Sequence, residues 1–343
     1  MSRRALTLLL AGVLAVGLTL SAAVARVPYV ALGPGPTYDT LGEVDSGDPV
    51  LEIEGRRTYP TDGHLDLTTV GVQPRLTLAQ ALQGWFARDL AVVPREVVFP
   101  PGRTDEEVDA ENAAAMEASQ SDAIGAAAQQ LGLRPAVSVQ GLTEGSAARG
   151  QLEPGDVLTA VDGDAIADAA ELRERISSRS PGDAVRVTFE RDGRTDTVDI
   201  VTTASTDDAA RAVIGVLTEE RYPLDVTINL EDVGGPSAGL MFALGILEKL
   251  GPESLTAGKH IAGTGEISPD GTVGPIGGIA QKLIAAKRKG AVAFLVPEGN
   301  CAEAAASDPP DGLTLVRVGT LDEALDGLAA LRAGERPAVC AAA

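Results

Sequence analysis

The pattern of hydrophobic and polar positions changes along the chain, and its first segment is the longest stretch without a charged residue. An uncharged, apolar run over residues 5–25 follows Arg3 and Arg4. As a helix, such a run would span about 30 Å, the thickness of the hydrocarbon core of a bilayer. The pattern favours an uncleaved transmembrane anchor over residues 1–27. A cleaved signal peptide is the alternative, because residues 23–25 (Ala-Val-Ala) supply a small-residue cleavage site, although its apolar region is normally about 7–15 residues long.

The segment after the apolar run shows one strand pattern and one helix pattern. Residues 64–72, HLDLTTVGV, alternate as a strand does. A helix is predicted over residues 77–88, with Thr77 as N-cap and Gln80 three residues later in a capping box. Its apolar face carries Leu78, Leu82 and Trp85.

The middle of the chain changes from one long helix to short strands. An alanine-rich helix is predicted over residues 112–131, ended by Gly132. Residues 136–166 then read as short strands broken by Glu-Gly, Pro-Gly-Asp and Asp-Gly turns, and a short helix follows, with Asp168 as N-cap. Residues 184–202 form a predicted hairpin around an Asp-Gly turn. Several strands and one helix in so few residues indicate a compact module.

The last third contains a strand, a turn and a helix around one serine. Residues 226–229 are β-prone, Gly234 and Gly235 make a turn, and Pro236 suits a first helical turn because its missing N–H is not needed there. Ser237 therefore lies among free backbone N–H groups at a helix start, which are donors that an oxyanion needs. A packing role for small residues at a helix start explains this stretch equally well.

Composition and charge exclude some function classes. Apolar residues make up 44% and charged residues 22% of the chain, as in globular proteins, but the net charge is −21. Such a surface repels phosphate backbones, so we expect no nucleic-acid partner. Cys301 and Cys340 fit an oxidising compartment as a disulfide, or they remain two free thiols. Only His64 and His260 are histidines and no metal-binding motif occurs, so we predict no metal site.

Lysine is confined to one region of the chain. All lysines lie in the last third, and positive charge elsewhere comes from arginine, which stays protonated and cannot act as a base. On a predicted helix over residues 278–289, Lys282 shares an apolar stripe with Ile279 and Leu283. Lys287 also touches that side of the helix. Periodicity alone does not choose between the two as a buried base.

The middle module resembles a PDZ domain of the bacterial protease-associated kind. The matching residues are GSAARGQLEPGDVLTAVDGDAI, within 136–166. The resemblance implies a groove between a strand and a helix that accepts an extended chain end by β-augmentation. We place the carboxylate-binding loop of this groove near residues 131–133.

The last third resembles the proteolytic domain of Lon-type serine peptidases over roughly residues 210–330. The matching blocks are GGPSAGLMFALGI and, at 261–300, IAGTGEISPDGTVGPIGGIAQKLIAAKRKGAVAFLVPEGN. The resemblance implies that Ser237 is the nucleophile, that Lys282 is the base, and that Thr264 hydrogen-bonds the lysine. Residues 64–72 and 77–88 would begin the same domain, with the PDZ module inserted.

The supporting residues and the energy source follow from the same resemblance. Backbone N–H groups around Gly235 and Ser237, next to Pro236, would stabilise the oxyanion. Lon enzymes carry aspartate where this chain has Gly234, which places any gating role of that aspartate in doubt. No nucleotide-binding P-loop motif occurs in the sequence, so we expect no ATP dependence and no cofactor.

The complete chain resembles the membrane-anchored PDZ–Lon proteins of the YlbL type. We predict an α/β (α+β) fold with the following parts: an anchor at 1–27, an extracytoplasmic lead-in and start of the protease domain at 28–110, a PDZ domain with its preceding helix at 111–204, and a Lon-type serine protease domain at 205–343.

The predicted function is that of an ATP-independent serine endopeptidase with a Ser237–Lys282 dyad, held at the cell membrane with its body outside the cytoplasm. Its expected partners are extracytoplasmic proteins or peptides and the membrane, and the resemblance implies a homo-hexameric ring. A non-catalytic PDZ adaptor or chaperone on a Lon-like scaffold is the alternative.

Overall fold

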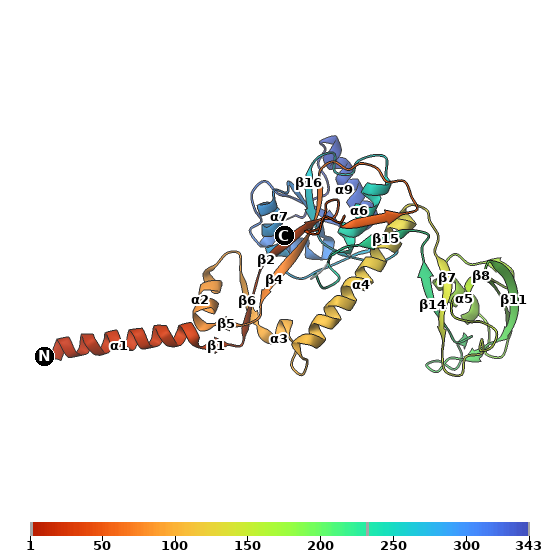
Figure 1. The fold of residues 1–343 in the computed structure, drawn as a ribbon, viewed down its shortest axis with the longest axis horizontal. Helices are drawn as coiled ribbons and strands as arrows, with labels where there is room; N and C mark the ends of the chain where they lie inside the picture. Colours follow the sequence, from red (N-terminus) through yellow and green to blue (C-terminus); the bar gives the residue numbers. More distant parts are fainter. Residues whose placement is uncertain (1–2, 231–232, 342–343) are drawn as a thin grey trace. The chain divides into compact units, whose positions relative to one another are not determined.

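A computed structural model describes residues 3–230 and 233–341, and the chain divides into two compact units (Figure 1). The first unit combines two distant segments, Met1–Ala127 and Val226–Ala343, and the second unit is Ala128–Asp225. The second unit is therefore an insertion in the first, as the sequence predicted.

The first unit mixes helices and strands. Its helices are α1 Arg3–Val24, α2 Leu78–Phe86, α3 Arg95–Val98, α4 Asp105–Gln130 (whose end enters the second unit), α6 Gly239–Leu250, α7 Ile279–Lys289, α8 Cys301–Ala306 and α9 Leu321–Ala333, with the 3₁₀ turn η1 Glu298–Asn300. Its strands are β1 Arg26–Val27, β2 Tyr29–Asp39, β3 Leu51–Glu54, β4 His64–Gln73, β5 Leu76–Thr77, β6 Ala91–Pro94, β15 Asp225–Ile228, β16 His260–Gly263, β17 Glu266–Ile267, β18 Val273–Gly274, β19 Ala293–Pro297 and β20 Thr314–Val318.

A six-stranded sheet organises this unit, in the order β20-β19-β16-β4-β2-β6. The first four strands run parallel, and β2 pairs antiparallel with both β4 and β6. β16 and β4 come from the two chain segments and pair with His260 opposite His64 and Gly263 opposite Leu67. This pairing joins the segments that the insertion separates.

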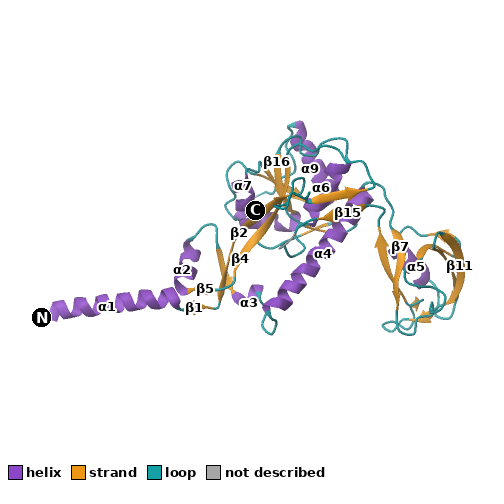
Figure 2. Cartoon of the chain, in the orientation of Figure 1, coloured by secondary structure: helices purple, strands orange, loops and turns teal. Residues whose placement is uncertain are grey.

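Helices α6 and α7 cover opposite faces of the sheet. Ala262 of β16 belongs to a buried cluster with Ile279 and Leu283 of α7, whereas a side chain on the next residue, Gly263, would collide with Met241 of α6. Successive strand residues point to opposite faces, so the two helices lie on opposite sides of β16. Figure 2 shows both helices beside the strands of this sheet.

The second unit is an antiparallel sheet with one helix. Its strands are β7 Ala136–Leu142, β8 Val157–Val161, β9 Asp164–Ala165, β10 Ala184–Arg191, β11 Arg194–Val201, β12 Thr203–Ala204, β13 Ala212–Val213 and β14 Val216–Arg221, and its helix is α5 Ala169–Ser177. The main order is β11-β10-β8-β7-β14. The predicted hairpin is β10–β11, and Asp168 caps α5 by accepting from the Glu171 N–H, as expected.

The boundaries of the units differ from those predicted at 111 and 204. Most of α4 belongs to the first unit, because Asn112, Met116 and Ser119 lie against the loop before α6. The segment up to Asp225 belongs to the second unit, because β14 completes its sheet beside β7. Both boundaries are set by contacts between residues that are distant in sequence, which the sequence pattern does not show.

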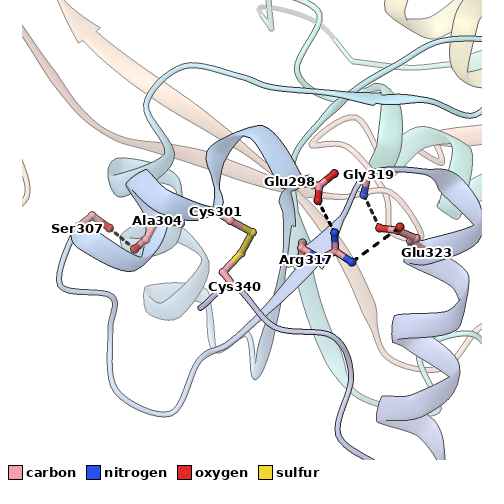
Figure 3. Close-up of a disulfide and its surroundings, with 8 residues drawn as sticks. All are labelled: Glu298, Cys301, Ala304, Ser307, Arg317, Gly319, Glu323 and Cys340. Carbon is pink, nitrogen blue, oxygen red and sulfur yellow. Dashed lines mark hydrogen bonds and ion pairs between the residues drawn. A yellow bond between two sulfur atoms is a disulfide. The ribbon is translucent and has the colours of Figure 1, made fainter. Parts of the chain in front are cut away.

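A disulfide closes the C-terminal segment, one of the two states the sequence allowed. Cys301, at the start of α8, is bonded to Cys340, 39 residues away (Figure 3). Beside it, Arg317 on β20 bridges Glu298 and Glu323. By the chain-entropy estimate, a loop of this size is worth on the order of 4 kcal/mol of stability.

The N-terminal elements match the sequence prediction in part. Helix α2 begins with the predicted capping box of Thr77 and Gln80, but its apolar face is exposed rather than packed. Within residues 3–230 and 233–341, no helix is long and apolar enough to cross a membrane, so the structure gives the predicted anchor no support.

Candidate active site

Three elements of the first unit bring the predicted site residues together. Ser237 lies just before α6, whose N-cap is Ala238. Thr264 directly follows β16, and Lys282 lies in the first half of α7. Ser237, just before α6, and Lys282, on α7, approach from opposite faces of the sheet. They meet at the carboxyl end of β16, next to Thr264.

The side chains of these residues form a connected hydrogen-bonding group. Lys282 Nζ lies 2.7 Å from Ser237 Oγ and donates to Thr264 Oγ1 at 2.8 Å. The Thr264 hydroxyl donates in turn to the Ser237 carbonyl oxygen at 2.9 Å. Thr264 thus makes the lysine contact that the resemblance implied, and it fixes both ends of the Ser237–Lys282 pair.

Burial prepares Lys282 to lose its proton at neutral pH. Its side chain is only 2% exposed. Removal from water disfavours the ammonium form and lowers the pKa of Lys282 to about 7, although the negative charge of Glu266 acts in the opposite direction. Lys287 contacts the Gly312 carbonyl oxygen instead. The structure therefore chooses Lys282 as the buried lysine of the helix, which periodicity could not do.

Ser237 opens into a cavity of about 470 Å³. The cavity is lined by residues of β2 and β4, of the loop before α6, and of α4, β17 and α7, among them Tyr38, Thr68, Met116, Ser237, Glu266 and Lys282. Its walls mix apolar surface with a few polar groups, as small-ligand and peptide sites do. The hydroxyl of Ser237 is thus accessible while its lysine partner is buried.

Helix α4 holds the loop that carries Ser237, which the sequence did not predict. Ser119 Oγ donates to the Pro236 carbonyl oxygen at 2.9 Å, and the Gly235 N–H donates to the Asn112 carbonyl oxygen at 2.9 Å. This N–H, a predicted oxyanion donor, is therefore engaged elsewhere. The alanine-rich pattern predicted a helix but could not show which loop that helix packs against.

At position 234, where Lon enzymes carry aspartate, helix α4 leaves no room for a side chain on Gly234. A Cβ on Gly234 would lie 2.9 Å from Asn112 Cβ, closer than side chains normally approach. Helix α4 thus occupies the space that an aspartate side chain would need.

The groove of the second unit lies elsewhere than predicted. A groove of about 760 Å³ runs between α5 and β14, lined by Leu172, Arg173 and Ile176 on one side and by residues 213–218 on the other. Residues 131–133 are not among the described residues that line it. The prediction for that loop is wrong because β14, near the end of the unit, and not the segment before β7, faces the helix.

Two family profiles match the two units. The profile of the PDZ domain matches residues 121–202, and that of the Lon protease (S16) C-terminal proteolytic domain matches residues 231–330. The chain combines a PDZ domain with a Lon-type proteolytic domain. Ser237, Thr264 and Lys282 all fall within the matched part of the Lon-type proteolytic domain.

Curated Lon proteases match about a third of the chain. Lon protease 2 of Bacillus subtilis (strain 168) is 37% identical over 105 residues, which cover 30% of this chain and 18% of that protein. Lon protease 1 of Sorangium cellulosum (strain So ce56) is 38% identical over 125 residues, which cover 34% of this chain and 15% of that protein. The chain therefore spans less than a fifth of the length of either relative.

A solved structure matches the other unit. The PDZ domain of an SdrC-like protein from Listeria monocytogenes is 26% identical, with a TM-score of 0.23, over 24% of this chain and 86% of that one.

Proposed function

We propose that the chain is a serine endopeptidase in which Ser237 is the nucleophile and Lys282 the general base. The contact of 2.7 Å between Lys282 Nζ and Ser237 Oγ carries this proposal. Neutral Lys282 takes the Ser237 proton while Oγ bonds to the carbonyl carbon of a peptide, giving a tetrahedral oxyanion. Collapse breaks the C–N bond, the Lys282 ammonium returns the proton to the leaving amine, and water then hydrolyses the acyl-enzyme by the same route.

The start of α6 supplies donors for the oxyanion. Among the hydrogen bonds of the described residues, none is donated by the Ser237 or Ala238 N–H. Both belong to the positive end of the helix dipole, next to the nucleophile. We assign the oxyanion to these N–H groups in place of the Gly235 N–H.

The PDZ domain recruits protein substrates through the groove between α5 and β14. β14 pairs with β7 along one edge only, and its other edge faces the groove. An extended peptide can add there as a further strand, with its side chains against Leu172 and Ile176.

The body of the protein acts outside the cytoplasm, held at the membrane by residues 5–25. The apolar run after Arg3 and Arg4 and the Cys301–Cys340 disulfide support this location. So does α2: the Leu78 N–H donates to the Ala25 carbonyl oxygen, which places the helix beside the end of the run. The exposed apolar side chains of α2 are then at the height of the membrane interface: Leu78, Leu82, Trp85 and Phe86.

A cleavage assay tests the dyad. The full chain is incubated with an unstructured protein, without nucleotide, and compared with Ser237→Ala, Lys282→Ala and Lys287→Ala. We expect the first two substitutions to lower kcat/KM by about 10³-fold or more, because each removes one partner of the proton transfer. Lys287→Ala removes a lysine from the same helix outside the dyad, and it should cleave as the unchanged chain does.

The outcomes separate the proposed enzyme from its alternative. Equal cleavage by all four proteins would remove the dyad from the mechanism. A chain that binds the unstructured protein through its PDZ groove, and cleaves it in no form, would instead be the non-catalytic adaptor or chaperone.

A further inference from the structure

The two histidines of the chain come together, with two aspartates, at the end of the sheet opposite to the active site. His64 begins β4 and His260 begins β16, and their rings lie 4.8 Å apart between centroids. His64 Nδ1 is 2.6 Å from Asp39 Oδ2 at the end of β2, and His260 Nε2 is 2.7 Å from Asp66 Oδ2. Residues separated by almost 200 positions thus form one cluster, and the chain uses histidine nowhere else.

One oxygen of this cluster lacks a partner. Asp66 is fully buried, and its Oδ2 accepts from His260. Among the side chains that the structure describes, Asp66 Oδ1 is the buried polar atom with no hydrogen-bond partner. Burying a carboxylate oxygen without a partner is costly, and such an atom in a native protein indicates an ion or another bound group.

The geometry of the cluster suits a small divalent cation. Ligand atoms of Asp39, His64 and Asp66 all lie within 4.8 Å of one another. A tetrahedral zinc ion, with bonds of about 2.0–2.2 Å, holds its ligand atoms about 3.3 Å apart. The 2.6 Å contact between His64 Nδ1 and Asp39 Oδ2 must therefore open, while ligand atoms farther apart than about 3.3 Å must approach one another. His64 can move, because its side chain is 55% exposed, while the buried Asp66 stays in place.

The surroundings of Asp66 match the outer shell of a metal site. His260 contacts Oδ2 of Asp66 and leaves Oδ1 without a partner, so the pair resembles the carboxylate–histidine pairs found beside many metal ions. The C-terminal end of α7 is next to the His260 ring, because a Cβ on its C-cap Gly290 would lie 3.7 Å from Nδ1. Helix C-termini favour positive charge.

We propose that Asp39, His64 and Asp66 bind a divalent transition-metal ion such as zinc, with His260 as the outer-shell partner of Asp66. Oxygen and imidazole ligands in a three-residue set suit zinc, and water completes the tetrahedron. The ion joins β2 to β4 and, through His260, to β16, whose other end is followed by Thr264 of the active site. This site does not depend on the proposed peptidase activity.

Zinc titration of the full chain, freed of metal with a chelator, tests the proposal. Calorimetry gives the stoichiometry, and nitrogen NMR of ¹⁵N-histidine-labelled protein reports the two imidazoles separately. We expect one zinc ion per chain, a large shift of the His64 signals, a smaller shift of the His260 signals, and no displacement by a tenfold excess of Mg²⁺. His64→Ala, at an exposed position that should not disturb folding, should weaken binding by about 10- to 100-fold.

Two further variants distinguish the cluster from the acidic surface. Asp66→Asn removes the buried ligand charge while keeping the side-chain shape, and it should also weaken zinc binding. Asp45→Asn removes an exposed carboxylate from the loop after β2 and should bind zinc as the unchanged chain does. Absence of saturable binding, unmoved histidine signals, or unchanged affinity in His64→Ala would each overturn the proposal.

Discussion

Lys282 owes its proposed chemistry to its burial, because Lys287, five residues later on the same helix, is partly exposed and contacts the Gly312 carbonyl oxygen instead. Burial lowers the pKa of Lys282 to about 7, while the carboxylate of Glu266 in the cavity wall acts to raise it. A base must be unprotonated, so the active fraction of the enzyme rises with pH through the pKa of Lys282.

The pH dependence of cleavage follows from these two opposing effects. We expect kcat/KM to rise from acidic pH with a midpoint near 7, instead of near the usual lysine value of about 10.4. Glu266→Gln removes the negative charge that stabilises the ammonium form, so its midpoint should move to lower pH. A midpoint above pH 9, or one that Glu266→Gln leaves unchanged or raises, would show that Lys282 does not govern the reaction.

Some residues of the site lie in recognisable sequence motifs, and others are identified only by their contacts in the structure. Ser237, Lys282 and Thr264 lie in the blocks that resemble Lon-type peptidases, and that resemblance implied all three; the structure brings their side chains together. Asn112 and Ser119 act through contacts with a loop more than 100 positions away, and nothing in an alanine-rich helix marks the face that makes them. The hydrogen bond from the Gly235 N–H to the Asn112 carbonyl oxygen results from the same packing, so the sequence could not predict it either.

At the scale of elements, local signals predicted the helices and strands better than their partners. The caps of α2 and α5 and the β10–β11 hairpin depend on residues a few positions apart, and the sequence placed them correctly. β14 lies about 75 residues after β7, yet it completes the same sheet and faces α5. Pairing of this kind depends on the whole unit, so the groove was assigned to the wrong segment.

The groove between α5 and β14 gives a binding prediction for the PDZ domain. Leu217 lines the groove and is half exposed. In the Ser237→Ala background, which prevents cleavage, Leu217→Ser should weaken binding of a fluorescent decapeptide with an apolar C-terminal residue about tenfold. Loss of one apolar contact of about 1.5 kcal/mol accounts for that factor.

A matched control lies at the other edge of the same sheet. Val201 on β11 is also exposed. Binding of the fluorescent decapeptide is measured by fluorescence anisotropy, and Val201→Ser should leave its affinity unchanged. Equal affinities for the Leu217 and Val201 variants would place the peptide outside the groove.

At the scale of the whole molecule, two features distant in sequence support one proposed location. The apolar run of residues 5–25 lies at one end of the sequence and the Cys301–Cys340 disulfide at the other. Paired arginines before an apolar run favour a cytoplasmic N-terminus, and a stable disulfide needs an oxidising compartment. The run alone would also suit a buried helix, but the two features together support a run that holds the body outside the cytoplasm.

Fractionation and thiol labelling of intact cells test this location. We expect the full chain to stay in the membrane after alkaline carbonate extraction, and Cys301 and Cys340 to react with a maleimide only after a reductant is added. A variant that lacks residues 2–25 should be soluble and carry reactive thiols, because it would stay in the reducing cytoplasm. If carbonate releases a shortened chain whose disulfide is intact, residues 5–25 act as a cleaved signal peptide and not as an anchor. Reactive thiols in the full chain would refute the extracytoplasmic location altogether.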